Sequence, residues 1–236
     1  MLNETFYLDG VDARSVGIQL QKPLTFSEAV PIVEIKTIQG RNGDLVHYTG
    51  SYENRSGSAS CYCLQKYVDN ALSSAGRFLM GKRGYRRLET SDDPNHYWMA
   101  RVENSPKIDM RAGFIAPFDV NFDCKPQRFL KNGETPLVFE SRETIFNYYG
   151  QTALPFITVY GKGSGWITIG KTTISITSIE DVLYLDSETQ NAYNGNGNQN
   201  RNIIAPVFPV LQDGESVISW GGDIERVEIV PRWWEL

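Results

Sequence analysis

Short runs of β-branched and aromatic residues, separated by turn residues, fill most of the second half of the chain. These runs occupy residues 156–160, 166–169, 173–176, 182–185, 217–220 and 226–229. No comparable stretch of this half shows the 3.6-residue period of an amphipathic helix. Two sheets with one apolar face each can hide those faces from water against each other. The pattern therefore predicts an antiparallel β-sandwich.

The first half of the chain shows two hairpin signals. Residues 6–8 run into Asp9-Gly10, a dipeptide typical of the two-residue turn that joins antiparallel strands. Residues 31–38 and 45–48 flank Gly40-Arg41-Asn42-Gly43, which predicts a second hairpin. We expect at least one glycine of this turn to have a positive φ, so that valine at Gly43 would destabilise the domain.

One segment of the first half has a helical period. Val68, Leu72, Ala75 and Leu79 recur at spacings of four, three and four, which places them on one face of a helix between residues 67 and 80. Gly81 is placed to end that helix. Further strands are predicted at residues 85–88 and 96–102. A last strand has one face formed by Phe118, Val120, Phe122 and Cys124, and we expect Lys125-Pro126 to end it.

The strand pattern weakens between residues 127 and 151, where Asn132-Gly133, Pro136 and Gly150 interrupt it. A chain of 236 residues is long enough for two domains. The sequence therefore predicts a mainly β protein with a domain boundary near residue 135. Residues 1–135 would form a β-rich domain with one α-helix, and residues 136–236 would form the β-sandwich.

Charge and hydropathy exclude some classes of function. The formal net charge is -5, and the basic residues are scattered apart from residues 82–87. A broad phosphate-binding face, and with it nucleic-acid recognition, is not expected. The first residues lack the basic and apolar regions of a secretion signal, and no apolar stretch approaches the length of a membrane span. We therefore expect synthesis in a reducing cytoplasm and no membrane insertion.

The three cysteines do not suggest a disulfide or a metal site. Cys61 and Cys63 are two residues apart in a predicted strand, so their side chains share a face and cannot easily bond to each other. A zinc site would need two further ligands, and Cys124, His47 and His96 show no zinc-like spacing. Half-buried core thiols, with no metal and no other cofactor, are the expectation.

Residues 165–172 match the phosphate-loop pattern G-x-x-x-x-G-K-[ST]. A phosphate loop needs a compact backbone that leads into the N-terminus of a helix. Here the interior alternates Trp166, Ile167, Thr168 and Ile169, and another strand-like run follows. A β-hairpin that turns at Gly170-Lys171 explains every residue, so no nucleotide binding is expected.

No motif nominates a catalytic site. Each of the two histidines, His47 and His96, lies in or beside a predicted strand without a framing motif, and no two carboxylates are spaced as an acid–base pair. Trp166, Trp220, Trp233 and Trp234 all fall in the predicted sandwich, where core packing is their commoner role and stacking on sugars is the alternative. The Asn- and Gly-rich residues 194–200 predict a mobile polar loop.

The order of these features resembles the distal tail protein family of long-tailed, non-contractile bacteriophages and prophages, over nearly the whole chain. In the first domain the resemblance rests on residues 38–45, 52–55, 84–88, 92–94, Tyr97 and 118–126. In the second domain it rests on residues 153–155, Ile157, Gly161, 184–189, 208–215 and 229–234. Glu215-Ser216 departs from the glycine- and asparagine-rich turn that relatives have there.

This resemblance implies a non-enzymatic tail-tip protein. Its N-terminal domain would be β-sandwich-like and form a homo-hexameric ring, and its C-terminal domain would be a galectin-like sandwich. The ring would hold the tail tube protein on one face and the tail-associated fibre or lysin protein on the other, with a receptor-binding protein as a further partner. The alternative is a carbohydrate-binding module that recognises host cell-wall sugars through the C-terminal sandwich, although no galectin-like set of His, Asn, Arg and Trp is evident.

Overall fold

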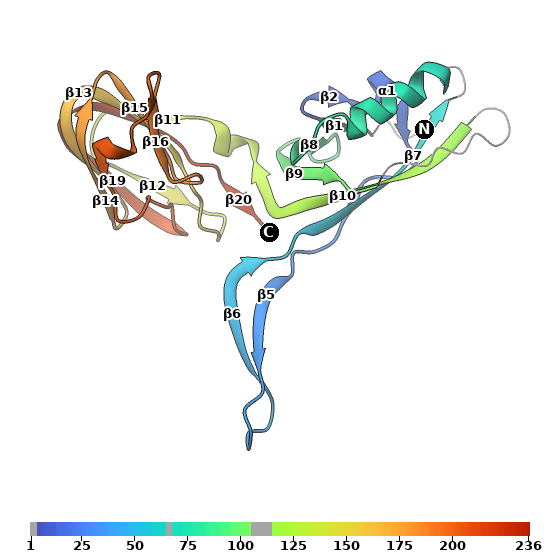
Figure 1. Cartoon of the computed structure of the whole chain (residues 1–236), viewed down its shortest axis with the longest axis horizontal. Helices are drawn as coiled ribbons and strands as arrows, with labels where there is room; N and C mark the ends of the chain where they lie inside the picture. Colours follow the sequence, from blue (N-terminus) through green and yellow to red (C-terminus); the bar gives the residue numbers. More distant parts are fainter. Residues whose placement is uncertain (1–3, 65–67, 105–114) are drawn as a thin grey trace. The chain divides into compact units, whose positions relative to one another are not determined.

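The computed structural model describes residues 4–64, 68–104 and 115–236, and the chain divides into two compact units (Figure 1). Unit 1 contains Met1–Arg128 together with Leu236, and unit 2 contains Phe129–Glu235. The division therefore falls slightly before the Asn132-Gly133 dipeptide at which the strand pattern weakens.

Unit 1 is built on an antiparallel sheet. Its described strands follow the order β2 (Val11–Asp12), β1 (Phe6–Leu8), β8 (Arg86–Thr90), β9 (His96–Val102), β10 (Ile115–Leu130), β7 (Arg55–Leu64) and β3 (Ile18–Leu20). The short β4 (Thr25–Phe26) also pairs with β7, and the 3-10 helix η1 (Ala13–Val16) connects β2 to β3. The predicted first hairpin is confirmed, because Leu8 pairs with Val11 across Asp9 and Gly10, whose φ angles are 52° and 78°.

The predicted helix of unit 1 is α1 (Val68–Met80), and it ends directly before Gly81 as expected. Ala75 and Leu79 on its apolar face are fully buried. Tyr67 and the side chains of Val68 and Leu72 lie outside the described part of the chain. Phe78, in the same helix, has its ring 6.0 Å from that of Phe6 in β1, so the helix covers the core of unit 1.

The expected apolar face of β10 is also confirmed. Phe118, Val120, Phe122 and Cys124 are all buried in the core of unit 1. The expectation that Lys125-Pro126 ends this strand was wrong, because β10 continues to Leu130. The ladder between β10 and β7 ends where Cys124 pairs with Arg55, so Pro126 lies beyond it, where its missing N–H costs that ladder nothing.

A second, separate sheet of unit 1 consists only of β5 (Pro31–Lys36) and β6 (Leu45–Tyr52). These strands form the predicted hairpin, and both Gly40 and Gly43 in its turn have positive φ, at 84° and 80°. Every residue of β5 and all but the last residue of β6 are exposed. The hairpin therefore contributes nothing to the core of unit 1.

Unit 2 contains one extensively paired antiparallel sheet. The order is β11 (Leu137–Phe139), β19 (Gly214–Val230), β13 (Phe156–Ile169), β15 (Val182–Asp186), β16 (Asn191–Asn194) and β17 (Gly197–Asn198). In addition, β12 (Glu143–Asn147) pairs with β19, β14 (Thr172–Ile179) pairs with β13, and β18 (Ile203–Ile204) pairs with β14. The short elements η3 (Lys131–Glu134), η4 (Asn200–Asn202) and β20 (Trp234–Glu235) complete the unit.

Two long strands turn this sheet into two layers. The first half of β13 pairs with β15, its second half pairs with β14, and β19 accompanies it along almost its whole length. The pairing register shifts between Gly161 and Gly165, where the strands bend. Inward-facing Ile157 before the bend and Ile169 after it belong to the same buried core. Each of these strands appeared in the sequence as two separate runs.

The predicted mainly β architecture, with one α-helix in the first part and an antiparallel sandwich in the second, is confirmed. No helix among the described residues is long and apolar enough to cross a membrane.

Candidate functional site

The segment that resembles a phosphate loop is a β-hairpin. Strand β13 ends at Ile169, β14 begins at Thr172, and these two residues pair across Gly170 and Lys171. Gly170 has a φ of 58°, as a two-residue hairpin turn requires. Because a strand follows the turn, the segment has no helix N-terminus to present to a phosphate group. The predicted turn is therefore confirmed, and the absence of nucleotide binding remains a prediction.

The two histidines occupy different elements of unit 1. His47 lies in the exposed hairpin, opposite Glu34. His96 begins β9, and its Nδ1 is 2.6 Å from Oδ1 of Asp93. Arg128 reaches the other oxygen of the same carboxylate. Burial raises the pKa of Asp93, but the hydrogen bonds from His96 and Arg128 outweigh that effect and hold it below its usual value. Asp93 thus links His96 of β9 to Arg128 of β10.

All three cysteines are core residues. The thiols are more deeply buried than the expected half-burial, because Cys61, Cys63 and Cys124 are at most 1% exposed. Burial raises the pKa of Cys61 and that of Cys124 to about 12, so both stay protonated at neutral pH. Across the residues that the structure describes, no group of three or more His, Cys, Asp and Glu side chains is placed to hold a metal ion.

The tryptophans of unit 2 divide into two kinds. Trp233 is 7% exposed and belongs to the core, and Trp220 and Trp234 pack against that core. Trp166, in contrast, is 42% exposed. Core packing, the expected role, therefore describes three of these four side chains, and Trp166 departs from it.

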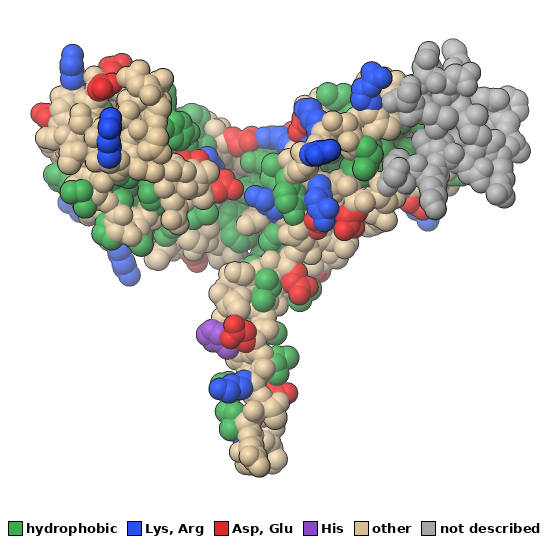
Figure 2. Space-filling model, in the orientation of Figure 1, with side chains coloured by type: hydrophobic (Ala, Val, Ile, Leu, Met, Phe, Trp, Pro, Cys, Tyr) green, Lys and Arg blue, Asp and Glu red, His purple; other side chains and the backbone are tan. Residues whose placement is uncertain are grey.

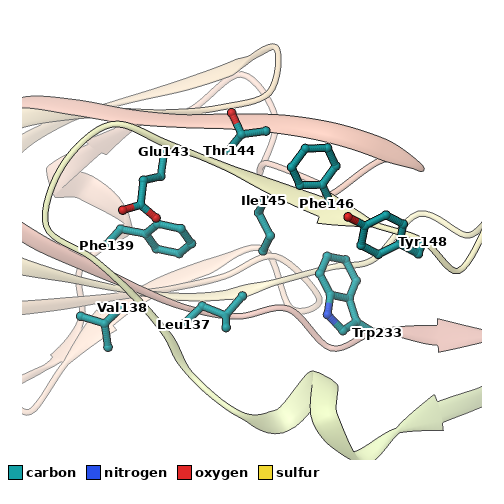
Figure 3. A pocket seen from close by; sticks show the side chains of 9 residues that line it. All are labelled: Leu137, Val138, Phe139, Glu143, Thr144, Ile145, Phe146, Tyr148 and Trp233. Atoms are coloured by element: carbon teal, nitrogen blue, oxygen red, sulfur yellow. The ribbon is translucent and has the colours of Figure 1, made fainter.

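An open groove of about 400 Å³ runs along the edge of unit 2 (Figure 3). Its wall includes Phe146 and Tyr148, which are 42% and 79% exposed and whose rings lie 5.8 Å apart at an angle of only 8°. In Figure 3 these rings and that of Trp233 lie toward one end of the groove. Glu143 supplies its one charged side chain. The lining offers aromatic contact and no paired acid and base.

A second hollow, of about 370 Å³, lies in unit 1. Its apolar wall is the stacked pair of Phe26 and Trp98, with ring centroids 4.3 Å apart. Arg55 at its edge donates from Nε to the carbonyl oxygen of Ser27 at 2.7 Å, so that this charged group already binds the chain itself. Neither hollow is lined by serine, cysteine or histidine.

The hairpin of β5 and β6 is the most unusual surface of unit 1. Val33 pairs with Tyr48 and Ile35 pairs with Val46, so these four side chains share one face, because directly opposed residues project to the same side. All four are exposed, Ile35 by 64% and Tyr48 by 67%. Figure 2 shows hydrophobic side chains exposed along this hairpin.

The opposite face of the hairpin is mixed, with charged residues beside Leu45, which is 43% exposed. Glu34 pairs with His47, and Lys36 pairs with Leu45. A wholly apolar face backed by a more polar one is the pattern of a strand pair that covers a hydrophobic surface. No such surface is supplied by the described part of the chain. The alternation of apolar and polar residues in the sequence predicted the hairpin. The same alternation would be found whether the apolar face packs on the protein's own core or on another molecule.

Comparison with known proteins gives one kind of match. No protein-family model and no curated protein sequence matches the chain. Among solved structures it is similar to the SPP1 Dit (gp 19.1) protein, described as a paradigm of the hub adsorption apparatus in phages that infect Gram-positive bacteria. The TM-score is 0.74 at 13% sequence identity, over 96% of this chain and 98% of that one. In both units, therefore, the chain has the fold of a phage distal tail protein.

Proposed function

We propose that this protein is a structural hub of a phage tail tip. In this role it forms a homo-hexameric ring that joins the tail tube protein to the tail-associated fibre or lysin protein, and a receptor-binding protein docks on the same assembly. The protein would be made in the bacterial cytoplasm and reside in the virion. It would act by binding other proteins, without catalysis and without a cofactor.

The observation that carries this proposal is the extent of the fold match. Nearly all of this chain superimposes on nearly all of a phage hub protein, so both units correspond and neither is an addition. Because sequence identity is only 13%, the functional correspondence rests on shape and on the resemblance of the motifs described above. The hexamer and the named partners are what that resemblance implies.

The exposed hairpin of unit 1 supports self-assembly on physical grounds. A closed ring needs a heterologous interface, in which one patch of each subunit meets a different patch of its neighbour. The apolar face formed by Val33, Ile35, Val46 and Tyr48 is such a patch, because none of the residues that the structure describes covers it. Contiguous exposed apolar surface of this kind is typical of protein interfaces. We therefore assign the ring contacts to the N-terminal domain, residues 1–135.

Unit 2 is proposed to be the peripheral, galectin-like domain of the hub. Its two layers enclose a hydrophobic core of its own. Its exposed aromatic groove is available for a tail-tip partner.

Two neighbouring residues of the hairpin provide a matched test. Ile35 and Glu34 are both exposed in β5 but project to opposite faces. Ile35→Ser should abolish chemical cross-linking into higher oligomers at high protein concentration, while Glu34→Ser should leave it intact. Both variants should melt at the temperature of the unaltered protein, because neither side chain contacts the core. If Ile35→Ser forms the same oligomers as Glu34→Ser, the hairpin is not the ring contact.

A further inference from the structure

Trp166 is the most exposed of the five tryptophans, and its position in the sheet explains how it is held. It lies in the second half of β13, with Gly221 of β19 opposite it on one side and Ser175 of β14 opposite it on the other. Its neighbour Ile167 projects into the core. Trp166 therefore stands on the outer face of this layer.

The indole ring of Trp166 packs against β19 at Gly221. A Cβ atom built on Gly221 would come within 2.9 to 3.0 Å of three adjacent ring atoms of Trp166, namely Cε2, Nε1 and Cζ2. The side of the indole that carries Nε1 therefore lies against Gly221, where no side chain intervenes. The contact with Gly221 leaves the residue 42% exposed.

Hydroxyl-bearing residues lie beside Trp166 on the same face of the sheet. Ser175 is its direct cross-strand neighbour, and Thr168 lies two residues along β13. Thr168 is itself opposed by Thr173 of β14 and by Ser219 of β19. The hydroxyls of Thr168 and Thr173 are 2.8 Å apart, which fixes their orientation. Because opposed residues share a face, the ring and these uncharged hydroxyls form one surface, which continues past Ser175 to Ile204 of β18, 65% exposed.

We propose that Trp166, with Thr168, Thr173 and Ser175, forms a binding site for a neutral sugar unit of a polysaccharide. A pyranose ring has an apolar C–H face, which fits an exposed indole, and hydroxyls at its rim, which can both donate to and accept from serine and threonine. Thr168 and Thr173 bond to each other, but an apolar protein segment would bury the hydroxyl of Ser175 without offering it a partner. An anionic ligand would find no cation among these four residues.

A purely structural role explains only part of this arrangement. A large aromatic ring that covers a cross-strand glycine shields the backbone there, as in many sheets. That role requires the contact between Trp166 and Gly221, but it does not require the hydroxyls on the solvent side. The sugar site goes beyond the proposed hub function, and the hexameric ring of subunits could assemble without it.

The test is a titration of the full-length protein with neutral oligosaccharides of glucose, galactose, N-acetylglucosamine and rhamnose, followed by calorimetry. We expect saturable binding of at least one of them. Trp166→Ala should weaken that binding by about tenfold or more, the loss of one ring-stacking contact. Trp166→Phe should retain part of it, and Ser175→Ala and Thr173→Val should each weaken it without lowering the melting temperature.

Tyr148→Ala is the matched control, because it removes a side chain that is 79% exposed from the separate aromatic groove of the same unit. It should leave sugar binding unchanged. The proposal is overturned if none of the four sugars binds, if Trp166→Ala binds as well as the unaltered protein, or if Tyr148→Ala abolishes binding while Trp166→Ala does not.

Discussion

The bend of unit 2 should depend on the absence of a side chain at Gly222. This residue of β19 lies where the sheet passes from one layer to the other, and its φ is 77°. A Cβ there would come within 2.5 Å of the carbonyl oxygen of Ser164 and 2.6 Å of Cα of Gly165. Alanine at this position therefore meets two obstacles, a strained backbone and a collision with the opposing strand.

Gly214, at the start of the same strand, separates these two effects. Its φ is 85°, but a Cβ there would have nothing within 4 Å. Gly214→Ala should therefore cost only the left-handed strain, about 1–2 kcal/mol. Gly222→Ala should add an overpacking cost of about 1–3 kcal/mol, giving roughly 2–5 kcal/mol in all. Gly195, which has open space and an ordinary φ, should tolerate alanine within about 0.5 kcal/mol.

Urea unfolding of the full-length variants measures these differences. At a slope of about 2 kcal/mol per molar urea, a loss of ~3 kcal/mol shifts the midpoint of the unit 2 transition by about 1.5 M. The two units can unfold in separate steps, so the transition of unit 1 serves as an internal reference. If Gly222→Ala is no more destabilising than Gly214→Ala, the close approach of β13 and β19 at this bend is wrong.

Three further predictions concern single groups. Because burial raises the pKa of the Cys61 and Cys124 thiols to about 12, neither should react with a thiol reagent at pH 8 in the folded protein, and both should react in urea; fast labelling of the native protein would contradict their burial. Titration of the protein with ATP and magnesium should give no heat and no thermal shift, since residues 165–172 form a hairpin; saturable binding lost in Lys171→Ala would refute this. Burial raises the pKa of Asp186, but its ion pair with Arg232 at 2.6 Å has the larger combined effect and holds that pKa below the usual 3.8. The stabilisation by this ion pair is therefore present at neutral pH and lost as pH falls below about 3.8. Asp186→Asn should lower the melting temperature at pH 6 and make the melting temperature fall less steeply in acid. An unchanged acid profile of the variant would count against the pair.

Local patterns predicted the elements that local chemistry decides. The helix that buries Ala75 and Leu79, the turn at Asp9 and Gly10, and the turn at Gly170 all follow from period or turn residues within a few positions. Strand continuity was harder to predict. The glycines between Tyr160 and Trp166 look like a break in the sequence, but their small size is what lets β13 bend against β19 without ending.

The segment of residues 194–200 is more ordered than its composition suggested. The polar residues 194–200, expected as a mobile loop, include a tight hairpin in which Tyr193 pairs with Asn198. Asparagine side chains cap its backbone, as where Oδ1 of Asn194 accepts from the N–H of Asn196. Composition alone does not distinguish such self-capped turns from open loops.

The candidate surfaces were the least predictable part. Core packing was the expected role of Trp166, as of the other tryptophans of its domain, but it lies opposite Gly221 on the outer face of β13 and is 42% exposed. The apolar alternation of β5 and β6 gives no sign that the face of Ile35 and Tyr48 is uncovered. Exposure depends on what the rest of the chain does not cover, and that information is not local to the hairpin.

The mass of the assembled particle tests the central proposal most directly. Native mass spectrometry of the full-length protein, over a range that extends to the highest attainable concentration, should show a species of six times 26.6 kDa that grows with concentration. Electron micrographs of the same sample should show closed rings. A protein that remains monomeric at every concentration, or that forms dimers or open chains without closed rings, would contradict the account of this chain as a ring-forming hub.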